Sequence, residues 1–227
     1  MAFTFFFRDL HTLELAVDRA LPAILGRSRP RVWDAGCATG QEPYSLAVLF
    51  SERLGHFAFR NLSIEATDLD ETGKFEEIVR QGCYPRAELE RIPADLREKY
   101  FEHVEYDRMR VCTALRDRIR FRRHNLLSLE PIGEGFSLIV CKNVLLHFSA
   151  EQRIEVIRMF HHALDPGGFL VMEQTQKLPG DAEVLFSQVV TDAQLFAKRR
   201  ESSTFLPPSL AEHVSSAGSR PHKGLSL

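Results

Sequence analysis

Short apolar runs alternate with amphipathic helical patterns along most of the chain, and this alternation constrains the fold more than any other feature. The runs expected to form strands are residues 31–35, 62–68, 119–124, 136–141 and 169–172. The helical patterns cover residues 10–24, 43–54, 70–81 and 150–164. Strands that alternate with helices are typical of βαβ units, so the sequence predicts an α/β fold with a doubly wound, mostly parallel sheet.

Three segments depart from the alternation. Residues 83–118 mix helix-like and strand-like fragments around two prolines and are expected to form an insertion. Residues 185–191 and 193–198 suit an antiparallel pair, with a single helix over 182–200 as the alternative. Ser, Pro, Gly and His dominate from Glu201 on, so we expect one domain over residues 1–200 and a disordered tail over 201–227.

Composition excludes several classes of protein. The chain has 29 Lys and Arg against 31 Asp and Glu, and a net charge of −2 is not that of a globally basic nucleic-acid binder. Its apolar stretches fall short of the roughly 18 residues of a membrane span, and Asp9 follows too early for a signal peptide. We therefore expect a cytoplasmic protein without membrane insertion. Neither a metal site nor a disulfide framework is expected from the scattered cysteines, Cys37, Cys83, Cys112 and Cys141.

Loops at the ends of predicted strands are the candidate ligand site, because open α/β sheets bind ligands beyond the carboxyl ends of their strands. These loops cover residues 34–42, 68–70 and 142–147. In the first, Gly36 and Gly40 allow positive φ and a close approach of a ligand to the backbone. The spacing matches neither a dinucleotide fingerprint nor a P-loop, and a purely structural turn is the alternative.

Asp68 ends the second predicted strand, where a carboxylate can accept hydrogen bonds from a ribose diol. Its distance along the chain from Asp34 exceeds the roughly 20 residues of the dinucleotide fingerprint. The alternative is a helix N-cap for the next element. Together, the glycine turn and Asp68 favour a cofactor that contains adenosine.

Several motifs make a specific combination. They are T-x-F-F-R at residues 4–8, A-G-C-A-T-G-x-E-P-Y-S at 35–45, H-N-L-L at 124–127, C-K-N-V at 141–144 and D-P-G-G at 165–168. In this order the chain resembles the CheR family of chemotaxis receptor methyltransferases over about residues 3–200. The resemblance implies a Rossmann-like class I methyltransferase domain with an antiparallel C-terminal hairpin and a small β-subdomain inserted within 83–118, which helps some members dock to receptors.

The resemblance also implies the activity and the residues that carry it. Family members transfer a methyl group from S-adenosylmethionine (SAM) to glutamate side chains of chemoreceptors and release S-adenosylhomocysteine, without a metal. Glu42 would bind the amino end of SAM, Asp68 its ribose, and Arg8 would hold the acceptor carboxylate near the sulfonium. The other residues implied at the cofactor are Thr4, Asp34, Gly36, Gly40, Asn125, Leu126, Lys142 and Asn143.

The sequence departs from the family pattern at three places. T-x-F-F-R comes almost at the start, without the family's N-terminal helical domain before it, and we expect the rest to fold without that domain. Lys142 stands where an arginine is usual, and His147 stands where the family has its active-site tyrosine. His147 is either a catalytic group that faces the acceptor or a structural histidine. The arginine-rich stretch 108–123 is either a solvated strand face or a docking surface for an acidic partner.

The sequence therefore predicts a SAM-dependent methyltransferase that acts on a carboxylate, which is already ionised at pH 7 and needs no general base. The expected acceptor is an acidic protein such as a chemoreceptor; a nucleic-acid partner is not expected. Two alternatives stay open. One is a methyltransferase for a small molecule or another protein, with an oxygen or nitrogen acceptor, and the other is a non-catalytic SAM-binding module.

Overall fold

The computed structural model describes residues 4–175 and 177–199, so the predicted tail lies outside the described residues. The main sheet has the strand order β6-β2-β1-β7-β8-β10-β9. Its strands are β1 (Arg31–Ala35), β2 (Ser63–Asp68), β6 (Ile119–Arg123), β7 (Phe136–Cys141), β8 (Leu164–Met172), β9 (Phe186–Gln188) and β10 (Leu195–Lys198). The first five in sheet order pair in parallel, whereas β10 pairs antiparallel to β8 and β9. This confirms the mostly parallel Rossmann-like sheet with a C-terminal hairpin.

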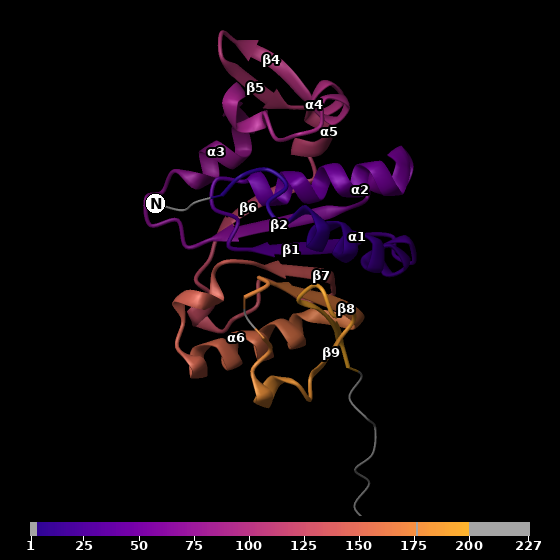
Figure 1. Ribbon diagram of the computed structural model, residues 1–227, viewed down its shortest axis with the longest axis vertical. Helices are drawn as coiled ribbons and strands as arrows, with labels where there is room; N and C mark the ends of the chain where they lie inside the picture. The colour runs from indigo at the N-terminus through magenta and orange to yellow at the C-terminus, as the bar shows by residue number, and fades with distance from the viewer. Residues whose placement is uncertain (1–3, 176, 200–227) are drawn as a thin grey trace, which may run out of the picture.

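Helices cover both faces of the sheet (Figure 1). Alternate residues of a strand point to opposite faces, so Val32 of β1 packs in a core with α1 (Leu10–Leu25) and α2 (Gln41–Phe59). Its neighbour Trp33 packs in a second core with α6 (Ala150–Ala163). The sheet is therefore held from both sides, and its strand ends are left to build a site.

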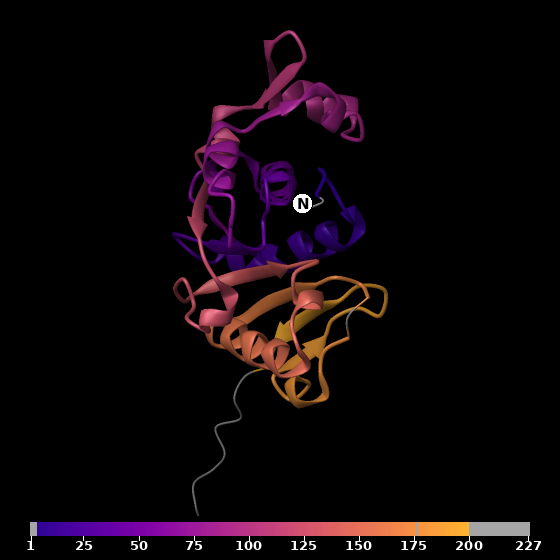
Figure 2. The same ribbon diagram turned by 90° about the vertical axis from the view of Figure 1, so that its left-hand side faces the viewer.

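A second, antiparallel sheet of order β3-β5-β4 follows helix α3 (Phe75–Gln81) and forms the end of the molecule farthest from α6 (Figure 2). Its elements are β3 (Cys83–Pro85), the 3-10 helix η1 (Arg86–Leu89), α4 (Ala94–Tyr100), β4 (Phe101–Glu105), β5 (Arg108–Val111) and α5 (Thr113–Arg116). Phe6 packs edge-on against the rings of Tyr84 and Phe101, with centroids 5.0 and 5.4 Å away. These aromatic contacts join the second sheet and its helices, residues 83–116, which we call the inserted unit, to the N-terminal segment.

Local signals predicted several elements well. The predicted strand over residues 136–141 is β7, and α6 begins after Ser149, whose hydroxyl accepts the N–H of Gln152 in a capping box. The alternative of a single helix over 182–200 is wrong, because β9 and β10 form a hairpin there. Helix α3 begins at Phe75 instead of the expected position near Asp70. The Asp70 carboxylate accepts the N–H groups of Lys74 and Phe75 and so holds residues 70–74 in a turn.

Most arginine side chains of the stretch 108–123 donate hydrogen bonds to backbone carbonyls of the protein itself. Arg108 donates to the carbonyl of Cys83 at 2.7 Å, and Arg123 donates to the carbonyl of Leu69 at 2.8 Å. Arg122 lies 3.4 Å from the buried carboxylate of Glu65. In these places the arginines connect neighbouring segments of the fold.

Two global features concern the described part of the chain only. No helix in it is both long and apolar enough to cross a membrane. Within the same residues, no group of three or more His, Cys, Asp and Glu side chains is placed to hold a metal ion.

Candidate functional site

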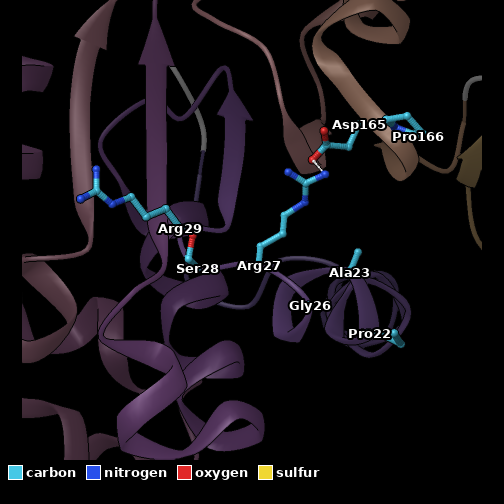
Figure 3. A pocket seen from close by; sticks show the side chains of 8 residues that line it. All are labelled: Pro22, Ala23, Gly26, Arg27, Ser28, Arg29, Asp165 and Pro166. Atoms are coloured by element: carbon cyan, nitrogen blue, oxygen red, sulfur yellow. Dashed lines mark ion pairs between the residues drawn. The ribbon is translucent and has the colours of Figure 1, made fainter.

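Two cavities lie at opposite ends of the strands of the main sheet, one at their amino ends and one at their carboxyl ends. The first, of about 500 Å³, lies beside the residues that precede β1 and the start of β8 (Figure 3). The guanidinium group of Arg27, which lines this cavity, forms an ion pair with the carboxylate of Asp165 at 2.7 Å. A parallel sheet presents its ligand site at the carboxyl ends of its strands, and this cavity lies at the amino ends.

The second cavity, of about 430 Å³, lies at the carboxyl ends of β1, β2 and β7. Its lining residues are Thr4, Arg8, Gly36, Ala38, Glu42, Asp68, Lys142, Asn143, Val144, Leu146 and His147. The fold thus brings together the three predicted strand-end loops and the N-terminal strap, by which we mean residues 4–9. We take this cavity as the candidate site.

The glycine turn is shaped by contacts with the neighbouring strand. Gly36 has a φ of 109° and donates its N–H to the carbonyl of Thr67 at 2.7 Å. A Cβ at this position would overlap Val144, so only glycine fits. Asp68 accepts the N–H of Ala38 at 2.9 Å and that of Asp70 at 3.1 Å. The carboxylate of Asp68 therefore ties the turn to the end of β2 and faces the same cavity.

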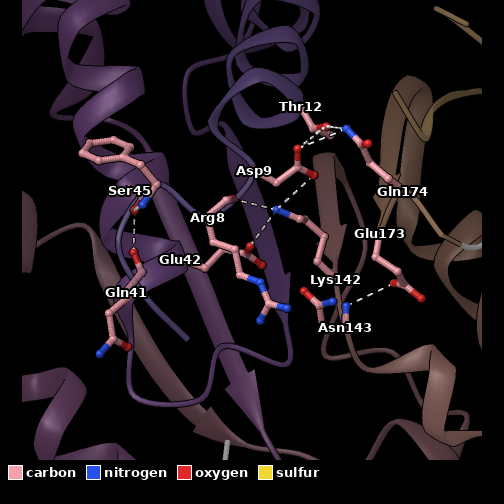
Figure 4. Close-up of polar contacts among 11 residues, drawn as sticks. Arg8, Asp9, Thr12, Gln41, Glu42, Ser45, Lys142, Asn143, Glu173 and Gln174 are labelled. Atoms are coloured by element: carbon pink, nitrogen blue, oxygen red, sulfur yellow. Dashed lines mark hydrogen bonds and ion pairs between the residues drawn. The ribbon is translucent and has the colours of Figure 1, made fainter. Parts of the chain in front are cut away.

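A buried ammonium group organises the charges of the site (Figure 4). The Lys142 side chain is 2% exposed, and its Nζ lies 3.3 Å from the carboxylate of Glu42 and 3.6 Å from that of Asp9. The same group donates to the carbonyl of Arg8 at 3.0 Å. Because buried charges need partners, Lys142 links the end of β7, helix α2 and the strap in one network.

Asp34, at the end of β1, is fully buried behind this network. Neither of its carboxylate oxygens has a hydrogen-bond donor in the described structure. Burial raises the pKa of Asp34 well above its usual range, and the neighbouring charge of Glu42 raises it further. Burial also raises the pKa of Glu42, although the Lys142 ammonium opposes that shift. The raised pKa of Asp34 favours its protonated form, and we expect that form to share its proton with Glu42, because a protonated carboxyl can donate a hydrogen bond to its neighbour.

This shared proton gives a testable pH dependence. Folding raises the pKa of the Asp34 carboxyl group. The protonated carboxyl group therefore stabilises the fold fully below about pH 3.9, the pKa of an unperturbed aspartate. This stabilisation is lost as the pH rises through the higher pKa of Asp34 in the folded state. An asparagine supplies an N–H to Glu42 at every pH. We therefore expect Asp34→Asn to gain stability relative to the wild type between pH 5 and pH 8, measured by urea unfolding. A difference that does not change with pH would contradict the shared proton.

The strap is held in place by backbone and side-chain contacts on both sides of Arg8. Phe7 donates its N–H to the hydroxyl of Ser45 at 2.8 Å. Asp9 accepts from the hydroxyl of Thr12 at 3.0 Å and from the amide of Gln174 at 3.2 Å. Phe7 and Asp9 both have a φ of 57°, a conformation that costs free energy in non-glycine residues and persists only where contacts enforce it. These anchors present Arg8 to the cavity.

His147 is exposed, ends the short 3-10 helix η3 (Leu145–His147) and lines the cavity. Leu145 in the same turn is fully buried and fixes its position. Asn143, with a φ of 61°, donates its N–H to the carboxylate of Glu173 at 3.1 Å. The loop after β7 is therefore anchored at both ends, with the imidazole at the open side of the site.

Four predicted site residues do not line this cavity. Asp34 lies behind it, and Gly40, with a φ of 98°, precedes the first residue of α2. Asn125 accepts the N–H of Leu127 with its own side chain, and Leu126 is buried in the core against α6. Their predicted roles at a cofactor stay predictions.

Sequence reasoning also missed several residues of the site. Ala38, Val144 and Leu146 line the cavity, and their positions in the predicted strand-end loops were the available signal. Asp9 was missed as a partner of Lys142, because the two residues are far apart in the sequence and no local pattern connects them.

Comparisons with known proteins place the chain in a family. Residues 2–194 match the family described as "CheR methyltransferase, SAM binding domain". A "Chemotaxis protein methyltransferase" of Vibrio parahaemolyticus is 32% identical over 181 residues, which are 78% of this chain and 65% of that protein. "Chemotaxis protein methyltransferase 1" of Pseudomonas aeruginosa is 34% identical over 184 residues, 77% of this chain and 66% of that protein. The chain thus spans about two thirds of the length of these relatives.

Among solved structures, a TehB-like SAM-dependent methyltransferase from Corynebacterium glutamicum superposes with a TM-score of 0.44 and 15% identity. The superposition covers 81% of this chain and 85% of that protein.

Proposed function

Because this chain belongs to the CheR methyltransferase family, we propose that it transfers a methyl group from SAM to a side-chain carboxylate of an acidic acceptor protein. The observation that carries the proposal is the convergence of Gly36, Glu42, Asp68 and Arg8 on one cavity at the strand ends. The same proposal includes a chemoreceptor-like acceptor and a cytoplasmic location of the protein. It also includes the division of the chain into one domain over residues 1–200 with an insertion at 83–118.

The residues of the cavity fit a cofactor with an α-ammonium group and a ribose. A side chain at position 36 would displace Val144, which lines the cavity, so the glycine keeps the backbone of the turn accessible to a ligand. Within the described residues neither carboxylate oxygen of Asp34 has a hydrogen-bond donor, and the Lys142 ammonium lies 3.3 Å from Glu42. An α-ammonium group beside Glu42 would supply one, and the carboxylate of Asp68 suits a ribose diol. When bound, SAM supplies a methyl group that is electrophilic because it is attached to a sulfonium.

The chain's own part is to bind and align the acceptor. Arg8 presents a planar guanidinium, which can hold a carboxylate through two parallel hydrogen bonds. Lys142 holds the carbonyl of Arg8 in place at 3.0 Å. A carboxylate is ionised at neutral pH and needs no general base, so alignment supplies much of the acceleration.

The direct test combines the full chain, methyl-labelled SAM and a peptide with one glutamate. We expect a base-labile methyl ester on the peptide and release of S-adenosylhomocysteine, both detected by mass spectrometry. If SAM binds but no carboxylate is methylated, the proposal is wrong. The chain would then be either a methyltransferase for another acceptor or a non-catalytic SAM-binding module.

His147 distinguishes the acceptor classes. For a carboxylate acceptor, the imidazole N–H can donate a hydrogen bond to it, so His147→Gln should keep most of the kcat/KM that His147→Phe loses. For an acceptor that must lose a proton, His147 would act as a base, which an amide cannot replace, so both variants should lose activity alike. Equal kcat/KM in the wild type and both variants would leave His147 a structural role only.

A further inference from the structure

The strap places one aromatic ring between the cavity and the inserted unit. Thr4 and Arg8 line the cavity, and Phe5 lies between them in the chain. Phe6 and Phe7 are buried, with 1% and 9% exposure, and hold the strap against the protein. Phe5 is only partly buried. Its ring is therefore fixed by its neighbours while one part of it stays accessible beside the site.

Two guanidinium groups stack on this ring. The Arg8 guanidinium carbon lies 5.8 Å from the centroid of Phe5, and that of Arg91 lies 4.6 Å from the same centroid. Both distances are in the range of cation–π attraction. Arg91 comes from the inserted unit, between η1 and α4, far from Arg8 in the sequence. The ring thus brings an arginine of the inserted unit next to the arginine of the site.

Arg91 is held in position but keeps its hydrogen-bonding groups available. The flanking residues Leu89 and Ile92 are buried, so the backbone at Arg91 cannot move freely. The Arg91 side chain itself is exposed. None of the ion pairs among the described residues involves Arg91, and Glu88, three positions earlier, accepts from the amide of Gln41 at 2.9 Å. A guanidinium stacked through its face still presents its N–H edge to a ligand.

Two guanidinium groups on one ring concentrate positive charge beside the cavity, and this charge attracts an anionic ligand to both. On the basis of the proposed carboxylate methylation, we propose that Arg91 is a second acceptor-binding residue. Arg8 receives the carboxylate to be methylated, and Arg91 receives a second carboxylate of the same acidic peptide. The site then selects a glutamate with another acidic side chain close by in the acceptor. Arg91 is a specificity residue that touches the acceptor outside the reacting carboxylate.

The test measures binding, so it does not depend on turnover. Two fluorescent peptides carry the same acceptor glutamate, flanked by Glu in one and by Gln in the other. Fluorescence anisotropy gives their affinities for the full chain saturated with S-adenosylhomocysteine. We expect the wild type to prefer the Glu-flanked peptide by about fivefold, the size expected for one exposed charge pair. In Arg91→Gln that ratio should fall to near one, and Arg91→Lys should recover part of it.

A matched control and a second variant complete the design. Arg86→Gln removes an exposed arginine of the same inserted unit that is not stacked on Phe5, and it should keep the wild-type ratio. Phe5→Leu removes the ring and should reduce the ratio, because Arg91 then loses its support. A ratio near one in the wild type, or a wild-type ratio in Arg91→Gln, would overturn the inference.

The experiment gives different results if the role of Arg91 is wrong and if the proposed function is wrong. Equal methylation and equal binding of both peptides would refute the role of Arg91 and leave carboxylate methylation intact. A binding ratio that depends on Arg91, without methyl ester on either peptide, would support the acidic-peptide site and refute the proposed reaction.

Discussion

Replacement of Lys142 by methionine is expected to lower the free energy of unfolding by about 3–5 kcal/mol, because it leaves the buried carboxylate of Glu42 without its ammonium partner. The Lys142 ammonium lies within 4 Å of both Glu42 and Asp9, and its side chain is 2% exposed. Methionine keeps a long, unbranched side chain, so the packing volume changes little. The loss should be larger at pH 8 than at pH 5. At the lower pH Asp34 and Glu42, whose pKa values burial raises, can bind protons and reduce the uncompensated charge.

Urea unfolding at both pH values measures this effect. Lys99→Met is the matched control, because Lys99 also pairs with a glutamate, Glu52 at 2.7 Å, but on the surface. Lys142→Arg keeps the charge and should be far less destabilising than Lys142→Met. A loss below about 1 kcal/mol in Lys142→Met, the size of an ordinary substitution, would show that Lys142 does not organise the charges of the site.

Replacement of Asp68 by alanine is expected to weaken SAM binding by about 1.5–3 kcal/mol, the range for hydrogen bonds to a charged group. Asp68 lines the cavity and already accepts the N–H groups of Ala38 and Asp70. The alanine variant loses the proposed contacts with the ribose and also the tie between β2 and the glycine turn. Both losses act in the same direction on affinity.

Isothermal titration calorimetry with SAM and S-adenosylhomocysteine measures the change. Thr39→Ala is a control in the same turn, because the Thr39 hydroxyl donates to the side chain of Gln41 and does not line the cavity. Its affinity for SAM should stay close to that of the wild type. An affinity in Asp68→Ala equal to the wild type would refute the ribose assignment.

Much of the fold could be predicted because its signals are local. The apolar run of β7 and the Ser149 cap of α6 each lie within one short segment, and the structure places both elements as expected. The start of α3 could not be predicted as well. Asp70 can either begin a helix or bond the backbone of a turn, and in the structure it does the second, so the helix starts five residues later.

The C-terminal hairpin shows where local pattern stops being informative. Residues 185–191 and 193–198 suit an antiparallel pair, but residues 182–200 also suit a single helix, so the local pattern left that alternative open. Pairing decided between them: β10 lies antiparallel to β8 with Leu195 opposite Val171, and both residues pack in the same core. The edge of an existing sheet stabilises a strand there through hydrogen bonds that an isolated segment does not have.

By itself, the sequence determined the alternation of strands and helices outside residues 83–118 and 182–200, the glycine turn and the strand-end loops that converge on the site. These depend on hydrophobic period, backbone freedom and caps, which act over a few neighbouring residues. Only the tertiary structure decided which charges meet. It placed Lys142 between Glu42 and the strap, buried Asp34 without a donor, and stacked Arg91 on Phe5. Such contacts join residues that are distant in the sequence, as in the bond from Lys142 to the carbonyl of Arg8, 134 positions apart. Their energies depend on burial and geometry, which exist only once the chain is packed.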